Sequence, residues 1–353
     1  MLKSIVYSFL IGTYGTMIYR VGLDTETGVM HILERYEATN ASYVMGDGNS
    51  IYSFSESGED SKVYSFKDGV RSEVPCSGDN PCFITLSPDS KYLLTADYSG
   101  GSVSVYPAKS GIVGERVHKL SFEGNGPVTR RQASPHIHQV KFLPDIPSVE
   151  GKWILAPDLG SDKIRIIKYL PAAGSDGNRA SDGNAGVLEH VSDITLPAGS
   201  GPRHIEFDVK RMMMYCICEL SGKVAAYKIS PTEGIPAFEL VQSIVADEFN
   251  TGGSGDIHLH PSGNYLYTSH RLKNDGISVF KVSGDGSLEK TGYVPTHEHP
   301  RNFLITPCGE YMLVAAKNTC TLQLFKIGAD GIPVATDSVL DLSPDAPTSV
   351  VLW

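Results

Sequence analysis

The sequence predicts an all-β protein, a seven-bladed β-propeller whose ring is closed by joining strands from the N- and C-terminal ends of the chain. Short Val-, Ile- and Tyr-rich segments bounded by turn residues recur along almost the whole sequence. The turn prolines Pro261 and Pro307 lie about 46 residues apart, close to the spacing of four-stranded blades. We find no linker between the repeats and therefore expect residues 1–353 to form one domain.

The repeat is clearest in Pro202–Tyr227, where three predicted strands follow one another. The same layout returns in four other units. Their first strands are expected at Cys82–Leu86, Ile137–Phe142, Ile257–His260 and Asn302–Thr306, beside His204–Phe207. Second strands are expected at Tyr92–Ala96, Trp153–Pro157, Met212–Cys218, Tyr265–Ser269 and Tyr311–Ala315. Third strands are expected at Val103–Tyr106, Ile164–Tyr169, Val224–Tyr227, Ile277–Phe280 and Leu322–Phe325, and a less regular fourth strand follows each.

The two ends of the chain complete the count of blades. A degenerate unit with the same order of strands precedes the regular ones, at Ala41–Met45, Ser50–Ser55 and Val63–Phe66. The segment Thr348–Trp353 resembles a first strand with nothing after it, whereas Tyr7–Thr13, Met17–Leu23 and Val29–Glu34 resemble strands two to four. Joining these segments gives a seventh blade and removes exposed sheet edges.

Composition excludes several classes of function. The net charge of −10 argues against general affinity for nucleic acid. No stretch approaches the roughly 18 apolar residues of a membrane-spanning helix, so we expect no membrane insertion. The six cysteines form no CxxC pair, which indicates reduced thiols and a cytoplasmic protein. Two longer stretches, 124–134 and 172–186, are expected to be surface loops.

In an up-down-up-down blade, the entry into strand one and the connection between strands two and three lie on one face of the disc. Ionisable and polar residues gather at these two places. The entries carry His136, His138, Arg203, Asp256, His258, His299 and Arg301, and the connections carry Tyr98, Asp158, Glu219, Arg271 and Lys317. We therefore expect these groups to converge at one mouth of the central channel and to bind a small anionic molecule.

Simpler interpretations exist for single members of this set. A histidine on a strand is usually structural, Arg203 or Arg271 alone could form an ion pair between blades, and Asp158 before Gly160 could be a turn former. The pair His136 and His138 could be read as metal ligands, but the surrounding arginines would repel a cation. We therefore expect no metal, and the sequence contains no GxSxG, P-loop or HExxH motif.

Several of these segments together resemble a known family. PCFITLSPDSKYLLTADYSGGSVSVY, HIHQVKFLPD with ILAPDLGSDKI, GPRHIEFD with CELSGKVAAY, and SGDIHLHPSGNYLYTSHR with GISVF are similar to the lactonase family of seven-bladed β-propellers. That family includes the bacterial propeller-type 6-phosphogluconolactonases and the fungal 3-carboxy-cis,cis-muconate lactonizing enzyme. The site proposed for the fungal enzyme, matched by local motif, implies His138, Arg203, Glu219 and Arg271 as catalytic residues here.

The resemblance implies hydrolysis of a sugar lactone, above all 6-phospho-D-glucono-1,5-lactone, without a cofactor. His138 or Glu219 would act as general base, and arginines would stabilise the anion. His136, Asp158, His258 and Arg301 are expected to bind substrate. Two alternatives stay open at this point: a muconate-type cycloisomerase using the same pocket, and a non-catalytic propeller that binds a ligand or a protein. The closed ring suggests a monomer.

Overall fold

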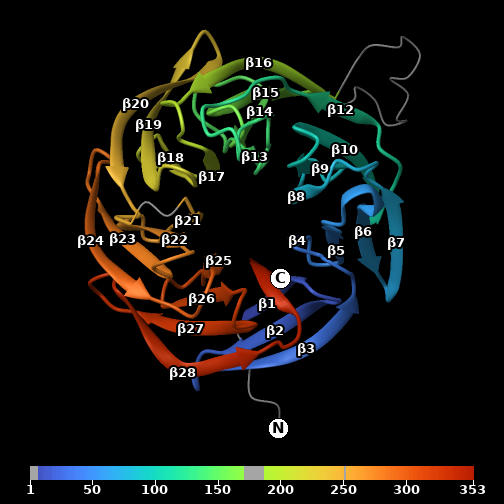
Figure 1. The fold of residues 1–353 in the computed structure, drawn as a ribbon, viewed down its shortest axis with the longest axis vertical. Helices are drawn as coiled ribbons and strands as arrows, with labels where there is room; N and C mark the ends of the chain where they lie inside the picture. Colours follow the sequence, from blue (N-terminus) through green and yellow to red (C-terminus); the bar gives the residue numbers. More distant parts are fainter. Residues whose placement is uncertain (1–6, 171–186, 250–251) are drawn as a thin grey trace.

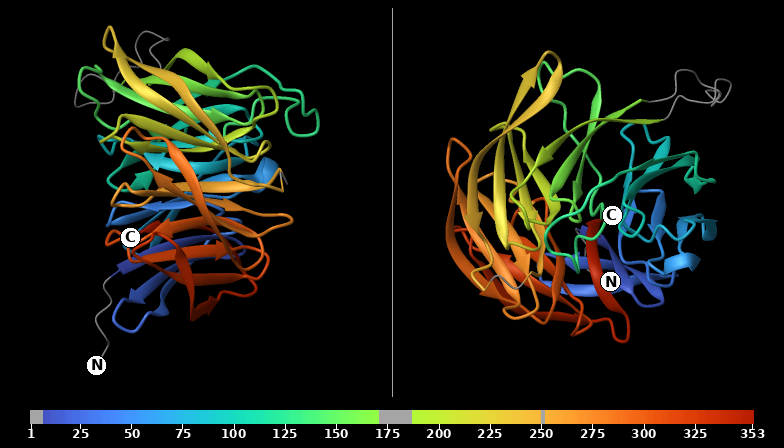
Figure 2. Two further views of the ribbon diagram at one scale, coloured as in Figure 1. Left: turned by 90° about the vertical axis from the view of Figure 1, so that its left-hand side faces the viewer. Right: turned by 45° about the horizontal axis from the view of Figure 1, so that its top comes forward.

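The computed structural model describes residues 7–170, 187–249 and 252–353, so that the loop expected at 172–186 lies outside the described residues. Seven antiparallel sheets form a ring, which confirms the predicted seven-bladed β-propeller (Figure 1). Figure 2 shows the ring from its side as a flattened disc, in which the strands run between the two faces.

The first strand of each blade lies nearest the axis of the ring (Figure 1). These strands are β4 (Val44–Gly46), β8 (Pro81–Leu86), β13 (Lys141–Phe142), β17 (Pro202–Asp208), β21 (Ser254–Leu259), β25 (Pro300–Ile305) and β29 (Ala346–Leu352). The second strands are β5 (Ser50–Phe54), β9 (Tyr92–Asp97), β14 (Lys152–Asp158), β18 (Met213–Cys218), β22 (Tyr265–His270), β26 (Tyr311–Ala316) and β1 (Tyr7–Tyr14).

The remaining strands lie towards the rim. The third strands are β6 (Lys62–Lys67), β10 (Ser102–Lys109), β15 (Lys163–Tyr169), β19 (Lys223–Thr232), β23 (Gly276–Val282), β27 (Thr321–Ile327) and β2 (Met17–Asp24). The outer strands are β7 (Val70–Pro75), β11 (Ile112–Val113) with β12 (His118–Ser121), β16 (Leu188–Thr195), β20 (Ile235–Val245), β24 (Leu288–Pro295), β28 (Pro333–Asp341) and β3 (Val29–Glu37). One 3-10 turn, η1 (Gly58–Asp60), lies between β5 and β6.

The last strand of the chain closes the ring as predicted. β29 pairs antiparallel with β1, so that Leu10 lies opposite Val351 and Ile11 opposite Val350. The sheet order is β29-β1-β2-β3, which makes one blade from the two ends of the sequence. Backbone hydrogen bonds therefore join the two termini and no sheet edge is left at the seam.

Apolar side chains fill the space between neighbouring blades. One cluster joins the blade β13–β16 to the blade β17–β20 and contains Leu155, Ile205 and Tyr227. Cys216 and Cys218 both belong to this cluster, which confirms that they share one face of their strand. All six cysteines are free thiols. Because the blades pack through such clusters, the first strands are held at fixed positions around the axis.

One predicted strand is much shorter than expected. The segment 137–142 pairs regularly only at β13, and Ile137 forms an isolated bridge with Asp158. Between these points the chain bonds sideways, since the Gln139 side chain accepts a hydrogen bond from the Ile205 backbone N–H of the next blade, at 2.8 Å. The interruption leaves His138 at the face of the disc where the other strand entries meet.

Candidate active site

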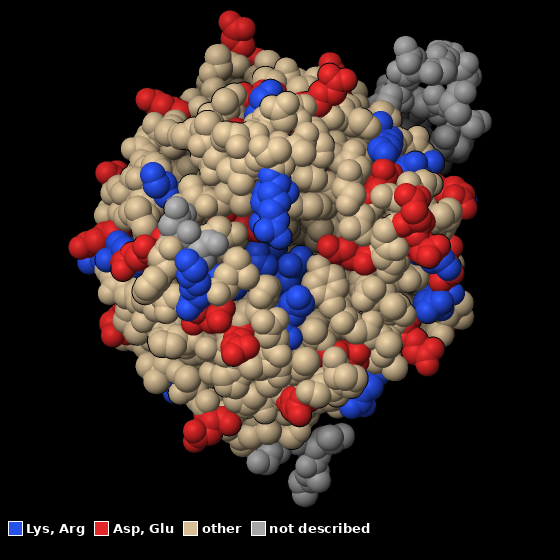
Figure 3. Space-filling view, in the orientation of Figure 1, with Lys and Arg blue, Asp and Glu red and all other residues tan. Residues whose placement is uncertain are grey.

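A cavity of about 200 Å³ opens on one face of the disc. Its walls come from several blades and one long loop: Tyr14, Glu56, Cys82, Tyr98, Arg131, His138, Glu219, Arg271 and Arg301. Figure 3 shows lysine and arginine side chains gathered around the centre of the ring, although the protein as a whole is acidic. The space suits one small molecule, and its lining favours an anion.

A β-bulge at the start of strand one aims several of these side chains. The pairing of strands one and two shifts between Pro81 and Phe83, between Pro202 and His204, and between Pro300 and Asn302. The bulged residues are therefore Cys82, Arg203 and Arg301. Bulges commonly re-aim a side chain beside a functional site. His138 holds the same position in its own blade. It follows Ile137, and the bridge between Ile137 and Asp158 corresponds to the pair Pro81–Asp97 that precedes the bulge at Cys82.

A second repeated position follows the paired part of strand two. The backbone N–H groups of Glu56, Tyr98, Glu219 and Lys317 donate to the carbonyls of Asn40, Asn80, Gly201 and His299. The last three carbonyls lie two residues before the bulged residues Cys82, Arg203 and Arg301. Tyr14 and Arg271 occupy the equivalent place at the ends of β1 and β22. Each blade thus places at least one side chain at the mouth from one of the two repeated positions, and the blade β8–β12 places two, Cys82 and Tyr98.

Asp158 is not brought to the cavity, although it was expected to bind substrate. It lies one residue before the repeated position, which Leu159 occupies, and its carboxylate is fully buried. Arg165 bonds to it through Nε at 3.1 Å and Nη2 at 2.6 Å, and the His136 N–H donates to it at 2.8 Å. Asp158 therefore ties β14 to β15 and holds the strand entry that carries His138.

Glu219 is the centre of the site. Its Oε1 atom accepts from Arg131 Nη2 at 2.7 Å, and its Oε2 atom lies 2.9 Å from Arg203 Nε and 3.2 Å from Arg271 Nη2. Burial alone would raise the pKa of Glu219, but the three arginines outweigh it and bring the pKa to about 2. Glu219 is thus a permanent carboxylate, and its oxygens hold three guanidinium groups in place.

Two of these arginines are fixed by backbone carbonyls as well. Arg203 Nη1 donates to Gly255 O at 2.7 Å, and Arg271 Nε donates to Gly253 O at 2.9 Å. A side chain at Gly255 would collide with the Arg301 carbonyl and with Ser269, so the glycine permits this approach of blades. Arg203 is only 2% exposed and lies behind the cavity wall, not at the rim where it was expected.

His138 is a neutral imidazole at neutral pH. Burial and the nearby Arg203, His204 and Arg301 hold its pKa well below the usual value. Its Nδ1 atom lies 3.8 Å from Cys82 Sγ, and Nε2 makes no hydrogen bond within the described residues. Burial also raises the pKa of the Cys82 thiol well above its usual value, so this thiol is protonated and a poor nucleophile.

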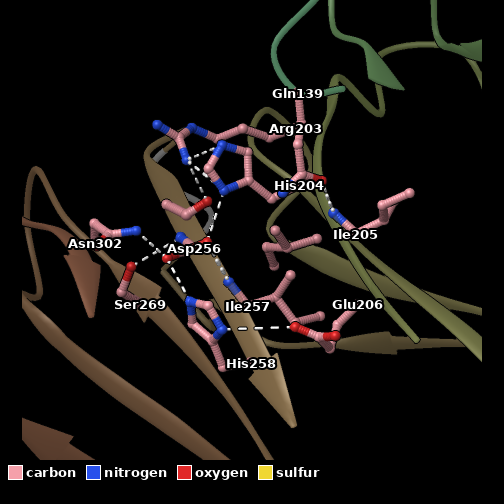
Figure 4. A network of polar contacts seen from close by, with 12 residues as sticks. Gln139, Arg203, His204, Ile205, Glu206, Asp256, Ile257, His258, Ser269 and Asn302 are labelled. Atoms are coloured by element: carbon pink, nitrogen blue, oxygen red, sulfur yellow. Dashed lines mark hydrogen bonds and ion pairs between the residues drawn. The ribbon is translucent and has the colours of Figure 1, made fainter. Parts of the chain in front are cut away.

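His258 lies in a separate network further along the first strands (Figure 4). Asp256 accepts from His204 Nδ1 at 2.7 Å and from His258 Nε2 at 2.9 Å, and it also contacts Asn302. His258 Nδ1 lies 3.6 Å from Glu206. Burial lowers the pKa of His258, but Asp256 and Glu206 outweigh it and raise the pKa to about 9. The positive charge of His258 is therefore neutralised by Asp256 and Glu206 within the network. His258 does not line the cavity.

His136 acts on the cavity through a neighbour. Its ring stacks on Tyr98 with centroids 4.3 Å apart and planes 6° apart, and its Nδ1 atom lies 2.7 Å from Tyr98 O. Tyr98 lines the cavity, and His136 does not. Arg301 does line it, with its guanidinium 5.1 Å from the Tyr14 ring centroid.

Four lining residues were not expected from the sequence, although three of them lie at positions that the repeat marks. Cys82 follows a proline at a strand entry, as Arg203 and Arg301 do, so alignment of the repeats would have placed it at the mouth. Glu56 and Tyr14 would have emerged from the same alignment. Arg131 lies in the long loop 124–134, which has no counterpart in the other blades, so the repeat contains no information about it.

In the described ranges, no group of three or more His, Cys, Asp or Glu side chains could hold a metal ion. None of the described segments forms a helix long and apolar enough to cross a membrane. The expectation of a metal-free, cofactor-free reaction stays a prediction.

Comparison with known proteins identifies the family. The family model described as "Lactonase, 7-bladed beta-propeller" matches residues 8–347. A 6-phosphogluconolactonase of Formosa agariphila is 31% identical over 337 residues, covering 91% of each chain. One of Bacillus subtilis is 31% identical over 253 residues, covering 70% of this chain and 66% of that protein. The chain belongs to the lactonase family of seven-bladed β-propellers, and the protein is an enzyme of the lactonase class.

Solved structures agree with this assignment. A putative 6-phosphogluconolactonase from Bacteroides fragilis superimposes with a TM-score of 0.89 at 34% identity, covering 100% of this chain and 99% of that chain. A periplasmic gluconolactonase from Pseudomonas aeruginosa superimposes with a TM-score of 0.84 at 26% identity, with 98% of both chains covered. Both likenesses extend over essentially the whole propeller.

Proposed function

We propose that the protein hydrolyses 6-phospho-D-glucono-1,5-lactone to 6-phosphogluconate. The observation that supports this most directly is the charge around the cavity. The lining residues Glu219 and Glu56 lie beside the lining residues Arg131, Arg271 and Arg301, and Arg203 is bonded to Glu219 behind the wall. The excess of two positive charges suits a phosphorylated sugar, whose phosphate carries about −1.5 to −2 charges at neutral pH. Relatives named 6-phosphogluconolactonase support the same substrate.

His138 is the residue we assign as general base. It lines the cavity, is neutral, and keeps Nε2 available, whereas both oxygens of Glu219 are engaged by arginines and its pKa of about 2 makes it a weak base. Nε2 takes a proton from water as the water oxygen attacks the lactone carbonyl carbon. The carbonyl oxygen becomes an oxyanion, and the cavity-lining guanidinium groups of Arg271 and Arg301 stabilise it.

Collapse of this intermediate breaks the bond between the carbonyl carbon and the ring oxygen. The leaving ring oxygen takes the proton from the His138 imidazolium, so that an acid and an alcohol are formed and the histidine is neutral again. Bound substrate helps the first step, because its negative charge offsets the arginines that lower the pKa of His138. A lactone is an activated ester, so one weak base and fixed cations are sufficient help.

Direct assay of the purified protein tests this proposal. The lactone would be made in situ and its disappearance compared with the spontaneous rate, which is appreciable for such lactones. We expect an excess rate that scales with protein concentration. A rate indistinguishable from the background would overturn the proposal. Ultraviolet assay with muconates, run in parallel, would reveal the cycloisomerase activity if that were the reaction.

We further propose that the enzyme works as a monomer in the cytoplasm, binding neither nucleic acid nor membrane. The β29–β1 seam leaves no edge at the joint for a second copy to pair with, the six thiols are free, and the net charge is −10. Analytical ultracentrifugation checks the oligomeric state, and a sedimentation coefficient that rises to that of a dimer would contradict it.

A further inference from the structure

We propose that Arg131 is the residue that selects phosphorylated lactones, by leaving Glu219 and binding the phosphate of the substrate. This inference rests on the proposed function and assigns a role to a residue of the long loop 124–134. The loop reaches the cavity, because Arg131 lines it and its Nη2 atom lies 2.7 Å from the carboxylate of Glu219, 88 positions away in the chain.

Arg131 is the only partner of Glu219, among the three arginines bonded to it in the described structure, that can move without disturbing the sheet. Its side chain is 34% exposed, against 3% for Arg203 and 6% for Arg271. Both of those also donate to backbone carbonyls of β21 or of the residue before it. Among the described residues, the guanidinium of Arg131 bonds only to Glu219 and, at 3.5 Å, to the Tyr98 hydroxyl. A ligand can therefore attract Arg131 at little structural cost.

The buried carboxylate of Glu219 stays paired when Arg131 moves away. Glu219 keeps Arg203 and Arg271 on its Oε2 atom, so the carboxylate stays paired when Oε1 is released. The released guanidinium offers a planar fork that matches phosphate, and such bidentate pairs are stronger than bonds between neutral groups. Arg131 thus exchanges Glu219, which already has two other arginines, for the phosphate dianion of the substrate.

The base of Arg131 is fixed even though its head is accessible. The neighbouring Gln132 is fully buried, and its Nε2 atom donates to Leu159 O at 2.9 Å and to Asp162 Oδ1 at 2.8 Å. The same Asp162 oxygen accepts from the Gly201 N–H at the entry of β17. Tyr98, held by its stack on His136, forms a wall beside the guanidinium. The loop is therefore tied to two blades and presents Arg131 at the cavity.

Arg130 provides a matched control, because it lies next to Arg131 in the same loop, carries the same charge and is exposed. The experiment measures kcat/KM for 6-phosphoglucono-1,5-lactone and for glucono-1,5-lactone with the wild-type enzyme and with Arg131→Ala, Arg131→Lys and Arg130→Ala. For Arg131→Ala we expect the ratio of the two kcat/KM values to fall by about 10- to 100-fold, the cost of one charged hydrogen-bonding partner. Arg131→Lys keeps the charge but not the fork, so its ratio should lie in between, and Arg130→Ala should keep the wild-type ratio.

An unchanged ratio would overturn the inference. If both kcat/KM values fell equally, Arg131 would act through Glu219, and if neither fell, Arg131 would have no role in the reaction. Calorimetric binding of 6-phosphogluconate and of gluconate separates this inference from the proposed function. If the wild-type enzyme fails to hydrolyse the phosphorylated lactone but binds 6-phosphogluconate at least tenfold more tightly than Arg131→Ala does, the inference stands without the proposed reaction. Absence of 6-phosphogluconate binding, or equal binding by both proteins, would reject it.

Discussion

Two histidines near the axis of the propeller, His138 before β13 and His258 on β21, lie in surroundings of opposite charge. At the mouth, burial together with nearby arginines holds the pKa of His138 well below its usual value, whereas further along the strands Asp256 and Glu206 raise the pKa of His258 to about 9. Burial disfavours the charged form of both rings. The neighbouring charges therefore decide that one ring is neutral and the other is a cation.

The mouth and the deeper layer around His258 also differ in what is left for a ligand. In the deeper network, His258 forms ion pairs with Asp256 and Glu206, and Lys141 forms an ion pair with Glu206 at 3.0 Å. At the mouth, arginines outnumber glutamates around a cavity. The charged groups of the deeper network therefore pair with one another and support the structure, whereas the excess of arginines at the mouth is available to bind an anion. We expect the chemistry to be confined to the mouth.

The largest effect is expected from the two histidines themselves. His138→Gln removes the proposed base and should lower kcat by about 100- to 10,000-fold, the range of general-base contributions. His258→Gln, in the deeper layer, should keep kcat within about fivefold, a change worth about 1 kcal/mol. Steady-state assay of both variants, with circular dichroism to confirm folding, makes the comparison. Equal losses would show that the layers do not differ in function.

Arg203→Gln should have the next largest effect. It removes one fixed cation from Glu219, and losing a charged hydrogen-bonding partner costs about 2–4 kcal/mol, or roughly a 30- to 1000-fold loss in kcat/KM. The neutral replacement is needed because Arg203 is 2% exposed, so that a glutamate there would bury a second carboxylate against Glu219. Lys141→Gln in the deeper layer is the control. If Arg203→Gln folds cooperatively and keeps activity within about threefold, Glu219 and its arginines are not part of the site.

The pH dependence of activity sharpens the contrast further. His138 must be neutral to act as a base, and its pKa is lowered in the free enzyme. The acid limb of kcat/KM should therefore lie well below pH 6.5, while that of kcat should lie at higher pH because a bound anion offsets the arginines. The kcat/KM profile is best measured with glucono-1,5-lactone, because it has no phosphate that titrates near pH 6. The shift in kcat is expected only with the phosphorylated lactone, which supplies the bound negative charge. An acid limb of kcat/KM near pH 9 would instead implicate His258.

The smallest effect concerns stability in the deeper layer. The folded-state pKa of His258, about 9, lies above its unfolded value of 6.5, so its charge stabilises the fold fully below pH 6.5 and this contribution is lost as the pH rises through 9. The difference in free energy of unfolding between wild type and His258→Gln should be constant below pH 6 and should shrink above pH 6.5. Urea titrations at several pH values measure it. A difference that grows with pH would reverse the assignment.

The order of strands was predictable from the sequence because blades are local structures. Each is a meander of neighbouring segments, so alternation of apolar residues and turn prolines specifies it without long-range information. The seam was also predictable, since the unmatched strand at 348–353 needed the unmatched strands near the N-terminus. The length of β13 was not, because Gln139 bonds to Ile205 of the next blade and so depends on how the blades pack.

For the site, the sequence predicted the face of the disc that carries the cavity and several of the strand entries and connections that line it, including His138, Glu219, Arg271 and Arg301. Only the tertiary structure decided the rest. A shift of one residue separates Asp158 from the mouth, because alternate residues of a strand point to opposite faces. Arg131 lies 88 positions from Glu219, and the fold of a long loop is set by buried bonds such as those of Gln132, not by any repeat. Whether a histidine is charged depends on neighbours from other blades, and the sequence does not contain those distances.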